Sequence, residues 1–273
     1  MGYTAVTIIA LDTATAVLSV ALVTRAFSPQ KEQWYGEIHA GHRHGELLME
    51  ISDQLIKTAG IKPQDVDVVV CMQGPGSFTG LRIGFAAAKG LALALKIPFL
   101  TVPTLDCIAF SCSHWPGLVV PVLDAKKQCY FTAFYRKEQR LTEYMDVSPA
   151  KIAELMVQNS QKVPDNTLLE RSILLTGPDG ARIVPELRAS LSSLAPEIQQ
   201  WIRLDPWGTK GWGKELLALA QRKIQTGNGD PEYTLQIESE VLAGPLYLRK
   251  SDAELQWEGA SSPIREGSVP SLS

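Results

Sequence analysis

The stretch Ile8-Ile9-Ala10-Leu11-Asp12 has a counterpart later in the chain, Val120-Pro121-Val122-Leu123-Asp124. Each is an apolar run that ends in Leu-Asp, and each is followed by a short turn and a second apolar run. Two apolar runs around a short turn predict a β-hairpin, here with a carboxylate at its turn. The repetition predicts two related α/β domains that each open with a hairpin. Chance is the alternative, since Leu-Asp is a common dipeptide.

Strands and helices alternate along the rest of the chain. Apolar runs predict strands at 7–11, 17–23, 33–38, 66–72 and 98–102, and helical spacing of apolar residues predicts helices at 45–59 and 81–95. Further on, the same patterns predict strands at 118–123, 129–135 and 173–175 and helices at 148–156 and 213–224. This order is typical of an α/β fold, and we expect domains at 1–104 and 105–250. The Ser-, Gly- and Pro-rich segment 251–273 is expected to be a disordered tail.

Composition narrows the classes of function. Of the 273 residues, 45% are hydrophobic and 20% are charged, which excludes a chain that is disordered throughout. The 26 Lys and Arg stand against 29 Asp and Glu, giving a net charge of −3. Proteins that bind nucleic acid unaided usually carry an excess of basic residues. We therefore expect tRNA binding only through a partner that supplies the positive charge.

The compartment is predicted from the cysteines and the apolar segments. The four cysteines form no C-x-x-C pair and are expected to be reduced and mostly buried, as in a cytosolic protein. The apolar start carries Asp12 and no basic leader, so it is predicted to begin a domain rather than a signal peptide. The longest apolar stretch, 83–95, contains Lys89 and is too short to cross a bilayer. We expect a cytoplasmic protein with no membrane partner.

The glycine loop Gly74-Pro75-Gly76-Ser77-Phe78-Thr79-Gly80 is the most specific local motif. It follows a predicted buried strand and opens a predicted helix, a context in which backbone N–H groups bind anions. Its spacing is not that of a P-loop, a dinucleotide fingerprint or a nucleophile elbow. The alternative, which the chemistry favours, is a tight strand-to-helix turn that needs glycine for its backbone conformation.

The helix that follows the glycine loop is apolar almost all round. Between residues 80 and 95 only Arg82 and Lys89 are charged, so most of its sides must be covered. Gly80, Gly84 and Ala88 form a stripe of small residues that allows another helix to approach closely. Burial inside its own domain is one explanation, and a partner chain against one side is the other.

Candidate metal and nucleotide ligands are few. His39, His42 and His44 are close in sequence, but His42 and His44 would not share a helix face, and a solvated loop or helix start is favoured over a metal site. Asp12 and Asp124 end the two matched strands. If the domains face each other, both carboxylates would meet in one cleft, as in a Mg-nucleotide site; the alternative is that both are turn residues. No Ser/His/Asp or Cys/His set can be assigned.

In chain order these motifs resemble the TsaB (YeaZ-like) family. The matching pieces are 8–15 (IIALDTAT), 44–48 (HGELL), 74–84 (GPGSFTGLRIG), 102–106 (VPTLD), 124–127 (DAKK) and 245–249 (PLYLR). They are densest from residue 6 to about residue 135, and 157–240 matches little. The resemblance implies a two-domain actin-like/Hsp70-like ATPase (ASKHA) fold with duplicated domains that each start with a β-hairpin.

The resemblance also implies a function. TsaB-like proteins act in making N6-threonylcarbamoyladenosine (t6A) in tRNA, as the non-catalytic dimerisation subunit that binds the transferase TsaD. A TsaE-like ATPase at the heterodimer, a homodimer, and tRNA bound only through the complex are implied as partners. TsaD holds its metal with an H-x-x-x-H, and Thr104 and Ile108 stand where those histidines would be, so no catalytic residue, metal or cofactor is expected. The first hairpin also lacks the glycine that active ATPases of this fold place beside phosphate.

Two sets of site residues follow. We expect the partner interface on the helices 45–59 and 80–95, at Leu47, Leu48, Ile51, Gly80, Arg82, Gly84, Ala87, Ala88 and Leu91. We expect a vestigial nucleotide cleft at Asp12, Thr13, Gly74, Gly76 and Asp124. The rival function is an enzyme of the same fold with its own active site, either a nucleotide-dependent transferase or hydrolase or a metallopeptidase.

Overall fold

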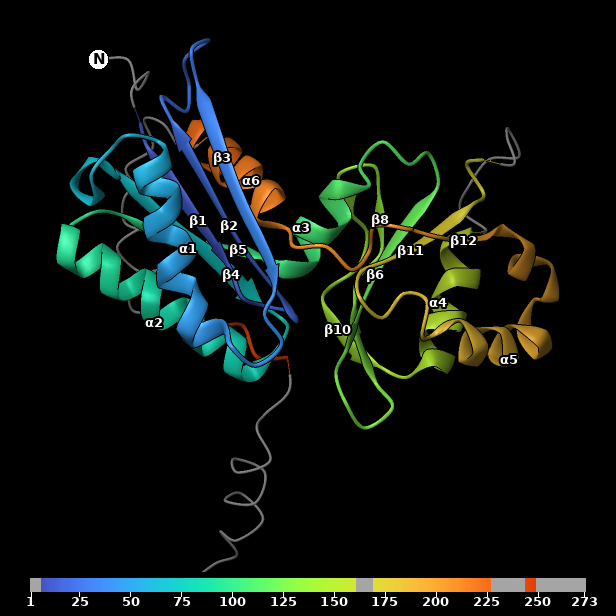
Figure 1. Cartoon of the computed structure of the whole chain (residues 1–273). Coiled ribbons are helices and arrows are strands. Elements are labelled where there is room, and N and C mark those ends of the chain that lie inside the picture. The colour runs from blue at the N-terminus through green and yellow to red at the C-terminus, as the bar shows by residue number, and fades with distance from the viewer. Residues whose placement is uncertain (1–5, 161–168, 227–243, 249–273) are drawn as a thin grey trace, which may run out of the picture.

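The computed structural model describes residues 6–160, 169–226 and 244–248, which form two α/β halves, each built on one sheet (Figure 1). The first sheet has the strand order β3-β2-β1-β4-β5. Its strands are β1 (Ile8–Asp12), β2 (Val17–Thr24), β3 (Glu32–His39), β4 (Val68–Gly74) and β5 (Phe99–Pro103). β1 pairs antiparallel with β2 and parallel with β4, which confirms the predicted opening hairpin.

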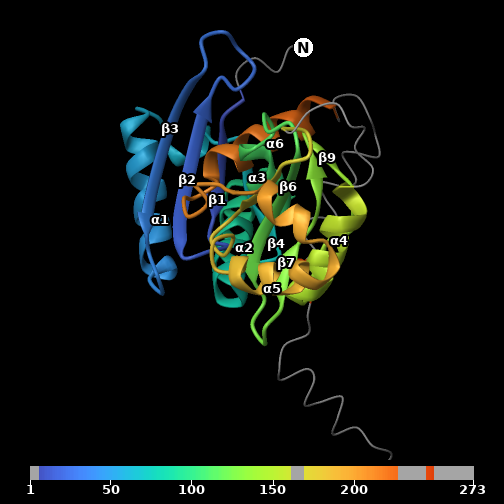
Figure 2. The ribbon, with the colours of Figure 1, turned by 90° about the vertical axis from the view of Figure 1, so that its right-hand side faces the viewer.

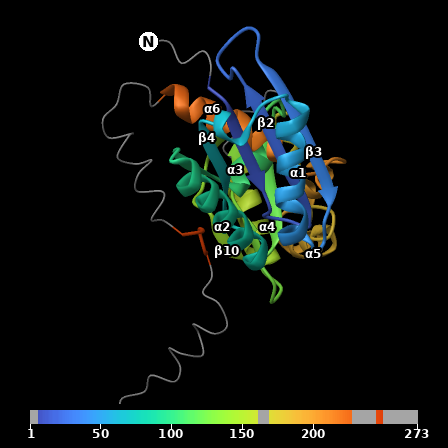
Figure 3. The same cartoon turned by 60° about the vertical axis from the view of Figure 1, so that its left-hand side comes forward.

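Alternating side chains of this sheet face two separate hydrophobic clusters. Ile9, Leu11 and Val69 belong to the cluster beneath α1 (His44–Thr58) and α2 (Phe78–Leu95), which Figure 3 turns toward the viewer. The alternate positions Ile8 and Ala10 belong to the cluster of α3 (Thr104–Ser111) and α6 (Gly213–Thr226). Strand residues alternate between faces with a period of two, so both faces of the sheet are covered by helices.

The second sheet repeats the opening arrangement. Its main path is β10-β7-β6-β11-β12, with β8 paired to β6 and β9. The bounds are β6 (Leu118–Asp124), β7 (Tyr130–Thr132), β8 (Tyr135–Arg136), β9 (Gln139–Arg140), β10 (Met145–Val147), β11 (Ile173–Thr176) and β12 (Ile202–Leu204). β6 pairs antiparallel with β7 and parallel with β11, just as β1 pairs with β2 and β4. The second predicted hairpin is therefore confirmed, and with it the duplicated α/β arrangement that the sequence predicted.

Helices α4 (Pro149–Ser160) and α5 (Val184–Leu194) cover one face of the second sheet (Figure 2). Two short 3-10 helices, Pro63–Asp65 and Pro196–Trp201, lie outside the main elements. The single strand predicted at 129–135 is divided into β7 and β8, because the buried residue Phe134 bonds instead to the side chain of Thr142, whose Oγ1 accepts its N–H at 3.0 Å. The predicted tail at 251–273 lies outside the described residues.

Helix α6 packs against the first sheet although it comes late in the chain. It contacts β1, β2, β4 and β5. The predicted boundaries 1–104 and 105–250 assign this helix to the second domain by sequence, whereas its packing places it on the first. The two halves are therefore linked both by the chain after β5 and by the return of α6.

Candidate functional site

Asp12 ends β1 and its side chain is completely buried. Its Oδ1 accepts the backbone N–H of Ala14 at 3.1 Å, and its Oδ2 accepts the Ser19 hydroxyl at 3.1 Å and the backbone N–H of Trp212 at 2.8 Å. The N–H of Gly213 donates in turn to Ser19 Oγ at 2.9 Å. Asp12 therefore holds the start of α6 onto the first hairpin. Burial raises the pKa of Asp12 to about 6, because desolvation outweighs the hydrogen bonds that favour the charged form.

Trp212 fills the space beside this carboxylate. It is fully buried and belongs to a cluster that also contains residues of both sheets, among them Ala10 of β1 and Val119 of β6. Its indole Nε1 has no hydrogen-bond partner among the described residues. Apolar side chains from α3, α6 and both sheets thus occupy the region between the two halves next to Asp12.

The glycine loop packs directly against the turn of the first hairpin. The N–H of Ser77 donates to the oxygen of Ala14 at 2.8 Å, and the Thr13 hydroxyl donates to the oxygen of Gly80 at 2.8 Å. A Cβ on Gly76 would lie 2.5 Å from the Ala14 oxygen, and one on Gly80 would overlap the oxygen of Thr13. The glycines are needed for close approach of two backbones, so the favoured alternative of a tight turn fits this geometry.

Two N–H groups that an anion would need at the start of α2 are already engaged. Ser77 N–H is bonded to the hairpin, and Gly80 N–H donates to the Ser77 hydroxyl at 3.2 Å, which caps the helix. Gly74 has a φ of +108°, and a Cβ there would lie 2.7 Å from the oxygen of Leu246. The loop is therefore enclosed by the hairpin on one side and by residues 244–248 on the other.

Asp124 ends β6 in a different environment. It accepts the N–H of Lys126 at 2.7 Å, the Lys126 ammonium at 2.9 Å and the Arg182 guanidinium at 2.9 Å. Burial alone would raise its pKa, but these bonds outweigh burial and hold the pKa of Asp124 below its ordinary value. The two aspartates of the expected nucleotide cleft are thus each bound by groups of their own surroundings, Asp12 by α6 and Asp124 by a local ion cluster.

The small-residue stripe of α2 faces inward. Gly80, Gly84 and Ala88 are buried, and a Cβ on Gly84 would overlap the Thr13 hydroxyl. The expectation that this stripe offers a surface for close helix approach is therefore wrong: the close approach is to the first hairpin of the same chain. Of the other expected interface residues, Leu47 and Leu48 are also buried, Ile51, Ala87 and Leu91 are half-buried, and Arg82 is exposed.

A different stripe of α2 faces solvent. It consists of Phe78, Arg82, Ala86, Gly90 and Leu93. Leu93 is 68% exposed, and a Cβ on Gly90 would meet nothing within 4 Å. Exposed Met49 lies on the neighbouring helix α1. By length and composition alone α2 could cross a membrane, but here it packs against β4. Only 33% of its residues are fully buried.

The candidate metal ligands do not lie together in a site. His39 and His42 are exposed, while His44 is buried at the start of α1, where burial lowers its pKa. Thr104 and Ile108 are completely buried in α3. Over the described ranges, no group of three or more His, Cys, Asp or Glu is placed to hold a metal ion.

Asp106 is a site residue whose contacts sequence reasoning missed. It lies in the first turn of α3, and its carboxylate accepts the hydroxyls of Tyr135 at 2.6 Å and Tyr144 at 2.8 Å. It thereby ties the first half to the β8–β10 region of the second. The sequence shows the motif 102–106, but nothing in it points to two tyrosines that lie 29 and 38 residues further along the chain.

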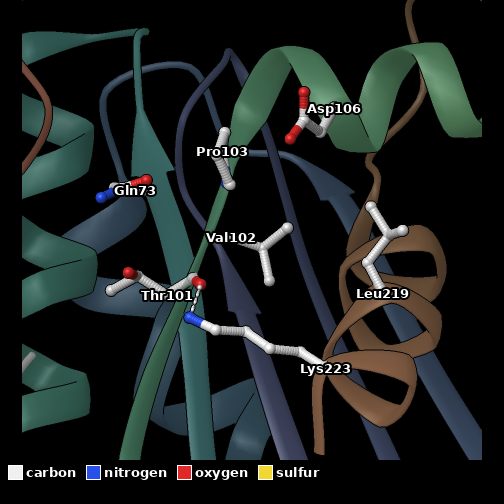
Figure 4. A pocket seen from close by; sticks show the side chains of 7 residues that line it. All are labelled: Gln73, Thr101, Val102, Pro103, Asp106, Leu219 and Lys223. Atoms are coloured by element: carbon white, nitrogen blue, oxygen red, sulfur yellow. Dashed lines mark hydrogen bonds between the residues drawn. The ribbon is translucent and has the colours of Figure 1, made fainter. Parts of the chain in front are cut away.

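Asp106 also borders a shallow pocket of about 360 Å³ between β5, α3 and α6 (Figure 4). In Figure 4, Lys223 reaches from α6 to the backbone oxygen of Thr101, with its Nζ 3.4 Å away. The lining is completed by Gln73, Val102, Pro103 and Leu219.

Two α/β domains that each open with a hairpin define a protein of the actin-like ATPase fold class, here with its first hairpin and glycine loop packed together. The model of the family "TsaD: tRNA N6-adenosine threonylcarbamoyltransferase" matches residues 37–197. The Bacillus subtilis (strain 168) "tRNA threonylcarbamoyladenosine biosynthesis protein TsaB" is 33% identical over 256 residues, which are 92% of this chain and 97% of that protein. The chain belongs to the TsaB (YeaZ-like) family.

Solved structures agree on the fold. A Pseudomonas aeruginosa structure titled "YeaZ" superposes with a TM-score of 0.59 at 24% identity, covering 81% of this chain and 93% of that one. A second P. aeruginosa structure, described as an uncharacterized protein with similarity to peptidase YEAZ, gives a TM-score of 0.63 at 22% identity and covers 89% of this chain and 100% of that one.

Proposed function

We propose that this chain acts in tRNA threonylcarbamoyladenosine biosynthesis as a non-catalytic subunit that binds a TsaD-like transferase through α1 and α2. The B. subtilis relative's name supports the pathway. The partner is supported by the TsaD family model, whose match at 37–197 includes both helices. A TsaD-family protein therefore carries counterparts of α1 and α2, and two related helix pairs can pack face to face about a pseudo-two-fold axis.

The observation that carries the proposal is the exposed stripe of α2. A helix this apolar is ordinarily covered on most sides, yet only a third of its residues are fully buried and one stripe along it is exposed. Phe78, Leu93 and the neighbouring Met49 are 38%, 68% and 45% exposed. Ala86 and Gly90 between them present little side chain, so a facing helix can come close. An exposed apolar strip with small residues at its centre fits a helix–helix contact.

The non-catalytic role rests on residue identity and on Asp12. Thr104 and Ile108 replace the histidines of the implied H-x-x-x-H, and neither side chain is a useful ligand for a catalytic metal. The carboxylate that an ATPase of this fold would present is engaged by Ala14, Ser19 and Trp212. The rival enzyme function would need that carboxylate to contact a ligand.

The same face also serves a homodimer, since two copies can present it to each other with isologous contacts. In the heterodimer a TsaE-like ATPase binds at the junction, and tRNA contacts the complex rather than this chain alone, whose net charge is −3. The complex works in the cytoplasm, where tRNA is modified.

The test compares two single variants, each with an arginine at an exposed helix position. Gly90→Arg puts a charge and a long side chain into the stripe, and Ala189→Arg makes a matched change on the exposed side of α5. Binding to the TsaD-like protein of the same cell is measured by isothermal titration calorimetry, and dimerisation by analytical ultracentrifugation. We expect Gly90→Arg to weaken both at least about tenfold, which is about 1.4 kcal/mol, while Ala189→Arg binds normally. Wild-type affinity for folded Gly90→Arg would refute the proposed interface.

A further inference from the structure

Residues 244–248 lie across the start of α2, beside the glycine loop (the red segment in Figures 1 and 3). The N–H of Leu246 donates to the oxygen of Gln73 at 2.7 Å. Gly74 makes this approach feasible, because a Cβ there would lie 2.7 Å from the Leu246 oxygen. Leu248 packs against the cluster beneath α6 and α3. This strap, as we name residues 244–248, is therefore held at its centre and at its end.

The strap brings Tyr247 onto the first turn of α2. The ring of Tyr247 lies 5.2 Å from that of Phe78, and the Tyr247 hydroxyl accepts a hydrogen bond from Arg82 Nε at 3.2 Å. The Arg82 guanidinium carbon lies 3.7 Å from the centre of the Phe78 ring. Arg82 is thus fixed on two sides, by a cation–π contact and by a hydroxyl acceptor.

This cluster remains open to solvent. Phe78 is 38% exposed and Tyr247 is 40% exposed. Within the described residues Arg82 makes no ion pair, and its one hydrogen bond uses Nε. Its two terminal nitrogens keep the planar fork that binds a carboxylate with two parallel hydrogen bonds.

We propose that the strap is part of the partner surface: Tyr247 positions Arg82 to form an ion pair with a carboxylate of the TsaD-like subunit. This inference rests on the function proposed above. Phe78 and Arg82 are the first two members of the exposed α2 stripe, so the strap extends the same surface at its N-terminal end. A long side chain held in its binding conformation before contact loses less entropy on binding. The surface is then assembled from two parts of the chain 165 residues apart.

The roles of Tyr247 and Arg82 are separated by a double-mutant cycle. Tyr247→Phe keeps the ring against Phe78 and removes only the acceptor for Arg82, and Arg82→Gln removes the charge. Affinity for the TsaD-like protein is measured for each variant, for the pair and for wild type, at low and high salt, with melting temperatures recorded alongside. We expect Tyr247→Phe to weaken binding about three- to tenfold and Arg82→Gln about tenfold or more, with a smaller loss at high salt.

The coupling between the effects of the Tyr247 and Arg82 substitutions on affinity decides the outcome. If Tyr247 acts through Arg82, the double variant binds as Arg82→Gln does, because the hydroxyl has nothing left to position. Full additivity of the two losses, or wild-type affinity for Tyr247→Phe, overturns the inference. Gly90→Arg separates failure of the proposed interface from failure of the strap's role. Normal binding by that variant refutes the interface itself. Weak binding by Gly90→Arg together with normal binding by Tyr247→Phe refutes only the role of the strap.

Discussion

The backbone N–H of Trp212 donates a hydrogen bond of 2.8 Å to the carboxylate of Asp12, 200 residues earlier in the chain. The aspartate that the sequence offers as a candidate ligand is therefore an anchor for the start of α6. A carboxylate near a helix N-terminus is favoured by the helix dipole, and here it also satisfies an N–H group that the helix leaves without a partner.

Asp12 gives the stability of the fold an unusual pH dependence. Its pKa rises from 3.8 to about 6 on folding, so between these values the folded state holds a proton that the unfolded state has lost. The contribution of Asp12 to the free energy of unfolding is thus greatest below the unfolded pKa and falls as pH rises through about 6. Relative to Asp12→Asn, which does not titrate, the wild type should lose about 2 kcal/mol between about pH 4 and about pH 7. Urea unfolding of both proteins across this range measures it, and a pH-independent difference would contradict it.

Two glycines of α2 should respond in opposite directions to the same substitution. Gly84→Ala places a methyl group against the Thr13 hydroxyl and should destabilise the fold by about 1–3 kcal/mol. Gly90→Ala adds a methyl group in open space within a helix and should stabilise it by about 0.5–1 kcal/mol. Chemical denaturation of the two variants gives both values. Equal shifts would show that Gly84 does not pack as described.

Asp106 should contribute more to stability than an ordinary surface carboxylate. Asp106→Ala leaves the hydroxyls of Tyr135 and Tyr144 without their charged acceptor, and we expect a loss of about 2–4 kcal/mol. Asp53→Ala, which removes an exposed ion pair with Lys57, is the control and should cost less than about 1 kcal/mol. Unfolding experiments on both variants check the difference. A loss for Asp106→Ala no larger than that of the control would mean that the tie between the two halves carries no stability.

The four thiols should differ in reactivity. Cys71, Cys107 and Cys112 are buried, and burial raises the pKa of Cys107 well above its ordinary value. Cys129 is the half-buried one. Because the thiolate is the reactive form, a brief treatment of the native protein with iodoacetamide should modify Cys129 first. Peptide mass spectrometry locates the label; Cys107 reacting as fast as Cys129 would contradict the packing around α3.

Local patterns in the sequence correctly predicted the strands of the two hairpins and the apolar helices. Continuous apolar runs such as those of β4 and β6 predict strands that are covered on both faces. In the structure both strands begin and end within two residues of the predicted bounds. Helices α3 and α5 were not predicted. Helix α3 has only 8 residues, too few for a clear period. Helix α5 carries Leu187, Leu191 and Leu194 at helical spacing, but this pattern covers only about two turns, and only Leu187 and Leu191 are buried.

The candidate site was harder to predict because its contacts are long-range. Periodicity shows that Gly80, Gly84 and Ala88 share one side of a helix, but on a helix that is apolar all round it does not show which side meets the sheet. That choice is made by Thr13, far away in sequence, which occupies the space that the glycines leave. The hydrogen bond from Trp212 to Asp12 and the contact of Tyr247 with Arg82 likewise depend on chain segments that meet only in the folded protein.

The late position of α6 has a consequence for synthesis on the ribosome. All five strands of the first sheet are complete at Pro103, but the helix that covers one of its faces begins at Gly213. At roughly 5–20 residues per second, the intervening stretch takes on the order of ten seconds to translate. Throughout that interval the nascent sheet lacks α6 over Ala10, Ala21 and Val70, and the carboxylate of Asp12 lacks the N–H that later binds it. Maturation of the first domain is thus timed by the emergence of a segment encoded beyond the second.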